Sequence, residues 1–111
     1  MPDSTGFRAD HLNRAYIEKD PTAELSYTVD WTQWLPLGTS IATSNFTVST
    51  VTGDATPLAI SNTLVINDQK CVVALTGGTA GEKYTVTNTI VTDNADKDSR
   101  RFIVVVKERY L

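Results

Sequence analysis

The chain has 111 residues, 41% of them hydrophobic, and a formal net charge of −3. This length predicts a single domain, and the composition is typical of a globular protein rather than a disordered or membrane-embedded one. The negative charge argues against a dedicated nucleic-acid binder, and no apolar run approaches the roughly 18 residues that a membrane-spanning helix needs.

Residues 1–23 are polar and charged, with only scattered apolar side chains. Leu12 and Tyr16 are one helical turn apart, so residues 9–19 are compatible with two or three turns of helix. Asp20-Pro21 ends the segment, because a residue before proline avoids helical geometry. We expect an extended or partly helical arm, which either orders on a partner or is a tail without a role. The segment also lacks the basic and apolar regions of a secretory signal.

From residue 24 onward the sequence alternates with the period of β-strands. In residues 24–31 every second side chain is apolar, which places Trp31 in the core. Residues 35–38 contain proline and glycine and end this strand. Residues 41–48 change parity midway, which predicts either a bulge or a switch of the strand from one sheet to the other, and Asn62 interrupts the apolar pattern of residues 58–66.

The second half of the chain continues this pattern. Residues 71–75 form an apolar strand, and the glycine-rich residues 77–82 form a loop in which glycine supplies positive φ. Residues 83–92 and 100–107 are strands joined by a hairpin loop. The sequence therefore predicts an immunoglobulin-like antiparallel β-sandwich of about seven strands in residues 24–111, preceded by the arm in residues 1–23.

Charge is distributed unevenly along the chain. Residues 97–111 carry five basic and two acidic side chains, a net charge of +3. Because the whole chain has a net charge of −3, the other residues carry a net charge of −6. This asymmetry indicates either an end that is steered towards a complementary protein surface or an edge strand that its charges protect from aggregation. Trp34, which follows a strand end, either caps the sandwich or anchors a partner, because tryptophan is enriched at interface hot spots. The side chains that we expect to contact a partner are Phe7, Leu12, Tyr16, Ile17, Trp34, Arg100 and Arg101.

The residues that carry chemistry are few. Cys71 lies in an apolar strand, where a buried hydrophobic role is favoured over a reactive thiol. His11 lies on the expected arm, which is a poor place for a catalytic base. Asp93, Asp96 and Asp98 supply oxygens that could surround Ca²⁺, but their order differs from that of an EF-hand, and a polar hairpin loop is the alternative. Residues 77–81 lack the ending of a phosphate-binding loop. We expect no enzymatic activity, no cofactor and no catalytic or metal-binding residue.

The order and spacing of several short segments resemble a known family. These segments are residues 19–21, Tyr27-Thr28-Val29-Asp30-Trp31 with Trp34-Leu35, residues 39–44, residues 75–81, residues 84–88 and residues 98–106. Together they are similar to short virion proteins of tailed phages, of the fibre–tail adaptor type, over about residues 19–109. The chain departs from that pattern in its longer polar arm and in residues 54–67.

The resemblance implies a non-enzymatic structural protein of a phage particle, made in the cytoplasm of the host bacterium, that joins the tail or baseplate to a fibre. Its partners would be other virion proteins, in a copy number set by the particle symmetry, and neither nucleic acid nor a membrane. Two alternatives remain open. One is a protein that decorates the capsid or neck, and the other is a carbohydrate-binding module that stacks a sugar on Trp34.

Overall fold

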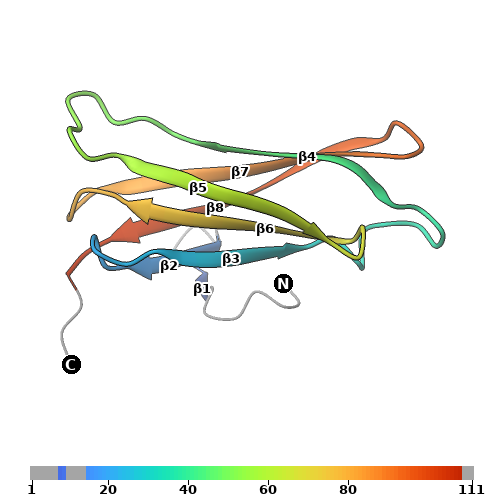
Figure 1. The fold of residues 1–111 in the computed structure, drawn as a ribbon, viewed down its shortest axis with the longest axis horizontal. Helices are drawn as coiled ribbons and strands as arrows, with labels where there is room; N and C mark the ends of the chain where they lie inside the picture. Colours follow the sequence, from blue (N-terminus) through green and yellow to red (C-terminus); the bar gives the residue numbers. More distant parts are fainter. Residues whose placement is uncertain (1–7, 10–14, 109–111) are drawn as a thin grey trace.

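The computed structural model describes residues 8–9 and 15–108, and in these residues all regular elements are strands (Figure 1). A two-residue strand, β1, is followed by seven longer ones. The strands are β1 (Arg8–Ala9), β2 (Ala15–Lys19), β3 (Leu25–Asp30), β4 (Ile41–Val48), β5 (Leu58–Ile66), β6 (Lys70–Gly77), β7 (Lys83–Thr92) and β8 (Lys97–Val106).

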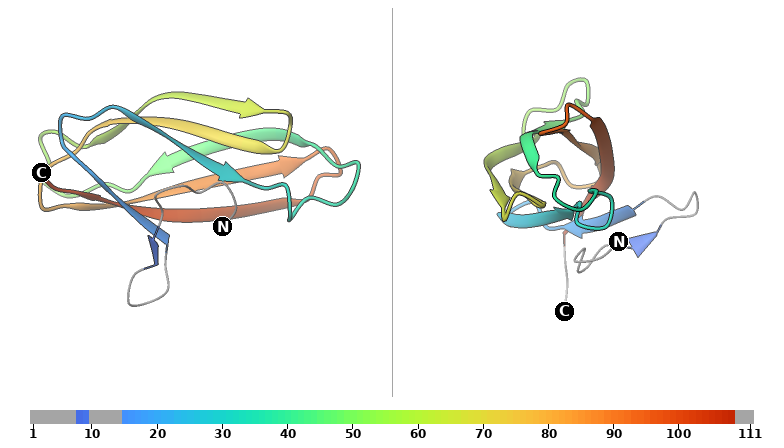
Figure 2. Two further views of the ribbon diagram at one scale, coloured as in Figure 1. Left: turned by 90° about the horizontal axis from the view of Figure 1, so that it is seen from below. Right: turned by 90° about the vertical axis from the view of Figure 1, so that its right-hand side faces the viewer.

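The strands form two sheets that pack face to face, which confirms the predicted β-sandwich. The larger sheet has the order β1-β2-β8-β7-β4, and the smaller one has the order β3-β6-β5. Without β1, seven strands are therefore divided into sheets of four and three. The molecule is elongated, at 44 × 25 × 23 Å, and the end-on view in Figure 2 shows the two layers of strands facing each other.

The core consists of the alternate side chains that the two sheets turn towards each other. On β7 the buried positions are Tyr84, Val86, Asn88, Ile90 and Thr92, and the positions between them are only partly buried. This is the strict period of two that the sequence of residues 83–92 predicts. The other buried hydrophobic side chains are Tyr27, Val29, Trp31, Leu35, Ile41, Phe46, Leu58, Cys71, Val73, Leu75, Phe102, Val104 and Val106.

Two irregularities in the ladders explain the changes of parity in the sequence. The register between β4 and β7 shifts between Ile41 and Thr43, so that Ile41 and Phe46 both reach the core. A second shift, between Ile60 and Asn62, divides β5 where its apolar pattern is interrupted. Both positions are β-bulges, in which an extra residue moves the following side chains to the other face.

The pairing of β2 differs from the expected fold. β2 lies within residues 1–23, which we expected to form an arm, yet it pairs in parallel with β8, with Ile17 opposite Val104. The sandwich is therefore not entirely antiparallel. The helix that seemed compatible with residues 9–19 is wrong for residues 15–19, because these residues are extended and hydrogen-bond to the edge of β8.

The position of β8 inside the larger sheet contradicts one interpretation of its charged residues. We considered an edge strand protected by basic residues, but β8 pairs with β2 on one side and with β7 on the other. Its apolar run 102–106 is thus inside the larger sheet, and Arg100 and Arg101 do not protect a free edge.

The connections collect at the two ends of the sandwich. At one end lie the β2–β3, β4–β5 and β6–β7 loops, and at the other lie the β3–β4, β5–β6 and β7–β8 connections (Figure 1). Gly77 at the end of β6 and Gly78 and Gly81 in the β6–β7 loop all have positive φ, as the sequence predicts. The loop leads directly into β7, so it has no helix at which a phosphate group could bind.

Candidate interaction surface

The side of the larger sheet that faces away from the core carries an apolar group on β2 and β8. Phe102, Val104 and Val106 point into the core, so Arg101, Ile103 and Val105 point outward. On β2, Lys19 is buried and Ile17 packs against the core, so Tyr16 and Glu18 point outward beside β8. The register places Tyr16 opposite Ile103 and Glu18 opposite Val105. We call this group the β2–β8 outer face, and it consists of Tyr16, Glu18, Arg101, Ile103 and Val105.

β2 is held in place by Lys19, whose side chain is fully buried. Its Nζ donates hydrogen bonds to the carbonyl oxygen of Gly77, at 2.7 Å, and to that of Asp20, at 2.9 Å. Burial lowers the pKa of Lys19, and the nearby Asp20 carboxylate partly opposes that shift. At the same end of the sheet, directly after β8, Lys107 donates its backbone N–H to the Lys19 carbonyl and forms a 2.7 Å ion pair with Glu18. These contacts fix the position of Tyr16 relative to Arg101.

Trp31 is the centre of a polar cluster inside the opposite end of the sandwich. Its indole Nε1 donates to Oδ1 of Asn88 at 2.8 Å, and Nδ2 of Asn88 donates to Ser44 and to the carbonyl oxygen of Asn45. The guanidinium carbon of Arg100 lies 4.3 Å from the centroid of the Trp31 ring, within range of a cation–π interaction. Arg100 also donates from Nη1 to the carbonyl oxygen of Asp30 at 2.8 Å. The cluster therefore joins β3, β4, β7 and β8.

The structure separates the residues that we expected to contact a partner. Tyr16 and Arg101 lie together on the β2–β8 outer face. Ile17 packs against the core, and half-buried Trp34 meets Trp31 edge to face at 5.3 Å between ring centroids. Arg100 is engaged by Trp31 and Asp30, and Phe7 and Leu12 lie outside the described residues.

Sequence reasoning missed Lys19 and Asn88. Asn88 shares the parity of Tyr84, Val86 and Ile90, and this shared parity is the signal that could have identified it as a buried polar group. Lys19 stands two residues after Ile17, but a lysine at that position is ordinarily read as solvent-exposed.

A second polar network closes the other end of the sandwich. Asp54 in the β4–β5 loop accepts hydrogen bonds from the Thr79 hydroxyl at 2.5 Å, from the Thr56 backbone N–H at 3.1 Å and from the Tyr84 hydroxyl. The Thr79 backbone N–H donates to the Tyr84 oxygen at 3.0 Å. The hydrogen bonds from Thr79 and Tyr84 lower the pKa of Asp54, whereas burial and the bond to Asp54 raise that of Tyr84.

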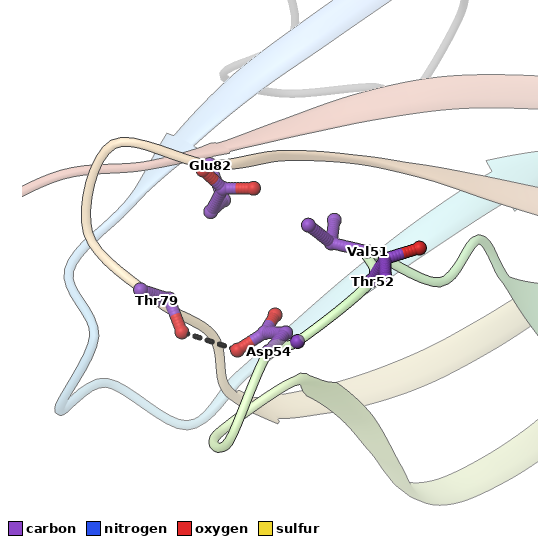
Figure 3. Close-up of a pocket in the computed structure, with 6 residues that line it drawn as sticks. Val51, Thr52, Asp54, Thr79 and Glu82 are labelled. Atoms are coloured by element: carbon purple, nitrogen blue, oxygen red, sulfur yellow. Dashed lines mark hydrogen bonds between the residues drawn. The ribbon is translucent and has the colours of Figure 1, made fainter.

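This network borders an open pocket of about 200 Å³. Figure 3 shows Val51, Thr52 and Asp54 on the β4–β5 loop facing Thr79 and Glu82 on the β6–β7 side. The Asp54 carboxylate joins the two loops, because within residues 15–108 it accepts its hydrogen bonds from Thr56, Thr79 and Tyr84. We therefore interpret the pocket as a junction between the β4–β5 and β6–β7 loops.

The candidate reactive groups do not form a catalytic or metal centre in the part of the chain that the structure describes. Cys71 is fully buried and unpaired with another cysteine, as expected for a small core residue, and burial raises the pKa of its thiol. Within residues 8–9 and 15–108, no three histidine, cysteine, aspartate or glutamate side chains are grouped as metal ligands, so Asp93, Asp96 and Asp98 do not converge. His11 is outside these residues.

A search of the described residues for membrane-spanning helices found none of sufficient length and hydrophobicity.

Comparison with known proteins gives one result for most of the chain. The sequence model of the family Gp77, described as podophage GP4 fiber-tail adaptor protein gp77, matches residues 19–105. The match begins at the buried Lys19 and includes β3 to β7 and nearly all of β8. A search of the curated proteins found none that matches the sequence. The chain therefore belongs to the podophage fiber-tail adaptor family, and it is a non-enzymatic structural component of the phage virion.

Proposed function

We propose that this protein joins the tail or baseplate of the particle to a fibre, and that it contacts one of these partners through the β2–β8 outer face. Family membership supports an adaptor that binds tail and fibre proteins. The observation that favours this particular surface is the group formed by Tyr16, Ile103 and Val105 beside the exposed, positively charged Arg101. Aromatic and arginine side chains around an apolar centre are characteristic of protein interfaces.

The mechanism is mechanical rather than chemical. The sandwich acts as a rigid spacer that is repeated by the particle symmetry, and residues 1–14 contact a neighbouring virion protein through Phe7 and Leu12. Many weak contacts made by several copies then give durable attachment, because each further contact forms at a high effective concentration. Ile17 supports this surface from the core side of β2, whereas Trp34 and Arg100 pack against Trp31. Direct partner contacts by these three residues remain a prediction.

We also propose that the sandwich is immunoglobulin-like. The order β3-β6-β5 in one sheet and β8-β7-β4 in the other corresponds to the B-E-D and G-F-C orders of that fold. Tyr84, near the start of β7, is hydrogen-bonded to the backbone N–H of Thr79 five residues upstream, like the tyrosine corner of immunoglobulin domains. Two departures are the placement of β2 beside β8 and the lack of a disulfide between the sheets.

A charge reversal on the outer face tests the proposed contact. Arg101 and Lys97 are both exposed basic residues on the same side of β8, but Lys97 is four residues before Arg101, farther from β2, and does not belong to the β2–β8 outer face. In phage that lack the natural gene and are supplied with variants, we expect Arg101→Glu to reduce incorporation into particles at least tenfold, while Lys97→Glu leaves it unchanged. Equal incorporation of the two variants would count against the surface.

The first part of the arm is tested by deleting residues 1–14, which removes the two-residue strand β1 but leaves β2 in place. A longer deletion of residues 1–23 would also remove β2 and the buried Lys19, and would therefore confuse a loss of partner contact with a loss of stability. If particles incorporate the protein without residues 1–14 as well as the full chain, the contacts that we propose for Phe7 and Leu12 are wrong.

Immunogold labelling of intact particles tests the position. Label at the tail end, where fibres attach, is the expected result. Label on the head or neck would replace the adaptor position with capsid or neck decoration. Binding to a glycan array that disappears in Trp34→Ala would instead favour the carbohydrate-binding alternative.

A further inference from the structure

β5 is an edge strand whose outer edge is open. It has nine residues, Leu58–Ile66, and within the described part of the chain it pairs only with β6. Most of its side chains are exposed, including Leu64 at 57%. The open edge of such a strand presents a row of backbone N–H and C=O groups that can pair with another strand.

The usual protection of an edge strand is weak in β5. The strand contains neither a charged residue nor a proline, the two types of residue that most often prevent edge-to-edge pairing. Its bulge lies between Ile60 and Asn62, so the ladder from Asn62 to Ile66 is regular. Among the described residues, five large apolar side chains are exposed, and three of them, Ile60, Leu64 and Ile66, are on β5. β4, the edge of the other sheet, also has no charge, but its large apolar side chains Ile41 and Phe46 are buried.

The outer face of the smaller sheet continues this apolar edge. Leu64 is directly opposite Val72 on β6, and Asn62 is opposite Ala74. A shallow groove of about 130 Å³ runs over these side chains, and its lining contains no charged group: Ser26, Asn62, Thr63, Leu64, Val72 and Ala74. A strand added at β5 would therefore extend the uncharged part of this face, which ends at Lys70 opposite Ile66.

We propose that β5 pairs with β5 of a second copy of this chain, antiparallel and related by a two-fold axis. Charge favours a second copy of the chain as the occupant. The protein is acidic, with a net charge of −6 outside residues 97–111, so two copies repel each other where their charged surfaces meet. An uncharged strand is a contact at which two copies do not place like charges opposite each other. A strongly charged partner would find no complementary group on β5.

The side-chain pattern also fixes the register. Residues directly opposite each other in an antiparallel pair point to the same face of the sheet. With Leu64 opposite Leu64 of the second copy, Asn62 faces Ile66 and Thr63 faces Val65, and every outward side chain remains outward. The two three-stranded sheets then form one continuous sheet of six strands. The β2–β8 outer face is on the other sheet and stays free for the partner in the virion.

Sedimentation velocity and light scattering of the full-length protein over a range of concentrations test the pairing. We expect a monomer–dimer equilibrium, and Leu64→Lys should raise the dimer dissociation constant at least tenfold. Leu37→Lys is the matched control, because Leu37 is fully exposed and belongs to the β3–β4 loop rather than to β5. A protein that stays monomeric, an assembly larger than a dimer, or a dimer that Leu64→Lys does not weaken would overturn the proposal.

A cross-link tests the register. Directly opposite Cβ atoms in an antiparallel pair are about 4.5–5.5 Å apart, close to the separation in a disulfide. Under mild oxidation we expect Leu64→Cys to form a covalent dimer, while Leu37→Cys stays largely monomeric. Cys71 is present in both variants but is fully buried. If the wild-type protein dimerises and Leu64→Cys does not cross-link, the proposed register is wrong. Unchanged unfolding midpoints verify that each variant folds.

Discussion

The indole nitrogen of Trp31 donates a hydrogen bond to Oδ1 of Asn88 at 2.8 Å, and both side chains are completely buried. Trp31 directly follows β3 in the smaller sheet, and Asn88 is in the middle of β7 in the larger one. The bond therefore connects the two layers through the core. Because Asn88 also donates to Ser44 and to the backbone of Asn45, one amide on β7 satisfies partners on β4 and directly after β3.

We predict that Asn88→Ala destabilises the protein by about 2–4 kcal/mol, since it leaves the buried Trp31 N–H without its acceptor, at about 1–3 kcal/mol, and removes the bonds to Ser44 and Asn45, at about 1 kcal/mol each. Urea unfolding followed by tryptophan fluorescence measures this change. Thr87→Ala is the control, because Thr87 is adjacent on β7 but points away from the core, and we expect it to change stability by less than about 0.5 kcal/mol. Similar losses in the two variants would mean that the bond between the layers contributes little.

The two neighbouring arginines of β8 should separate stability from assembly. Arg100 lies over the Trp31 ring and donates to Asp30, so Arg100→Ala should lower the free energy of unfolding by about 1–3 kcal/mol. Arg101 is exposed on the outer face, so Arg101→Ala should change it by less than about 0.5 kcal/mol. Thermal unfolding of both variants and their incorporation into particles together provide the measurement. If Arg101→Ala is the more destabilising variant, it is wrong that Arg100 contributes to stability and Arg101 to assembly.

The Asp54 network predicts how stability depends on pH. Hydrogen bonds from Thr79 and Tyr84 hold the pKa of Asp54 below 3.8 in the folded state. A carboxyl group of this kind stabilises the fold at pH values above its unfolded pKa, and that contribution is lost as the pH falls below 3.8 through the folded pKa. We therefore expect the difference in unfolding free energy between the wild type and Asp54→Asn to be constant near neutrality and to shrink below pH 3.8.

Tyr84→Phe provides a second measurement of the same network. When the Tyr84 hydroxyl is removed, Asp54 loses one hydrogen-bond donor and the Thr79 N–H loses its acceptor. The variant should therefore unfold at a lower urea concentration, and its stability should depend less on pH below 3.8. Tyr16→Phe is the matched control, because Tyr16 is on the β2–β8 outer face, away from this network. Equal unfolding midpoints for the two phenylalanine variants would contradict the prediction.

The parts of the fold that follow from local pattern could be predicted from the sequence. The alternation of residues 83–92 matches β7 residue for residue, and the parity change in residues 41–48 correctly indicated a bulge. β2 could not be predicted in this way, since its five residues carry a weak pattern and are extended only because β8 offers a parallel edge, 87 residues away at the Tyr16–Ile103 pair. The same applies to Lys19, whose burial depends on the distant Gly77 carbonyl.

The candidate surface was only partly predictable for a related reason. The sequence indicates that Tyr16 and Arg101 are exposed, but only the register of β2 on β8 brings them to one face. Arg100 has the same residue type and nearly the same position, but the alternation of the strand turns it inward to Trp31. Separating two adjacent arginines requires the parity of β8, which Phe102, Val104 and Val106 would already have provided.

The β6–β7 loop packs closely against β8 at Gly78. Gly78 has a φ of +100°, and a Cβ atom added there would lie 2.7 Å from Cγ2 of the buried Val106. Gly78→Ala combines an unfavourable backbone conformation with overpacking, so we expect a loss of about 2–4 kcal/mol in chemical unfolding. Gly53 has a φ of +79° but open space around it, so Gly53→Ala should cost only the backbone conformation, about 1 kcal/mol. Equal losses of stability in the two variants would show that Val106 moves aside freely. A larger loss in Gly78→Ala would show that the end of β8 next to Lys107 and Lys19 is tightly packed, as is required to hold β2 against β8.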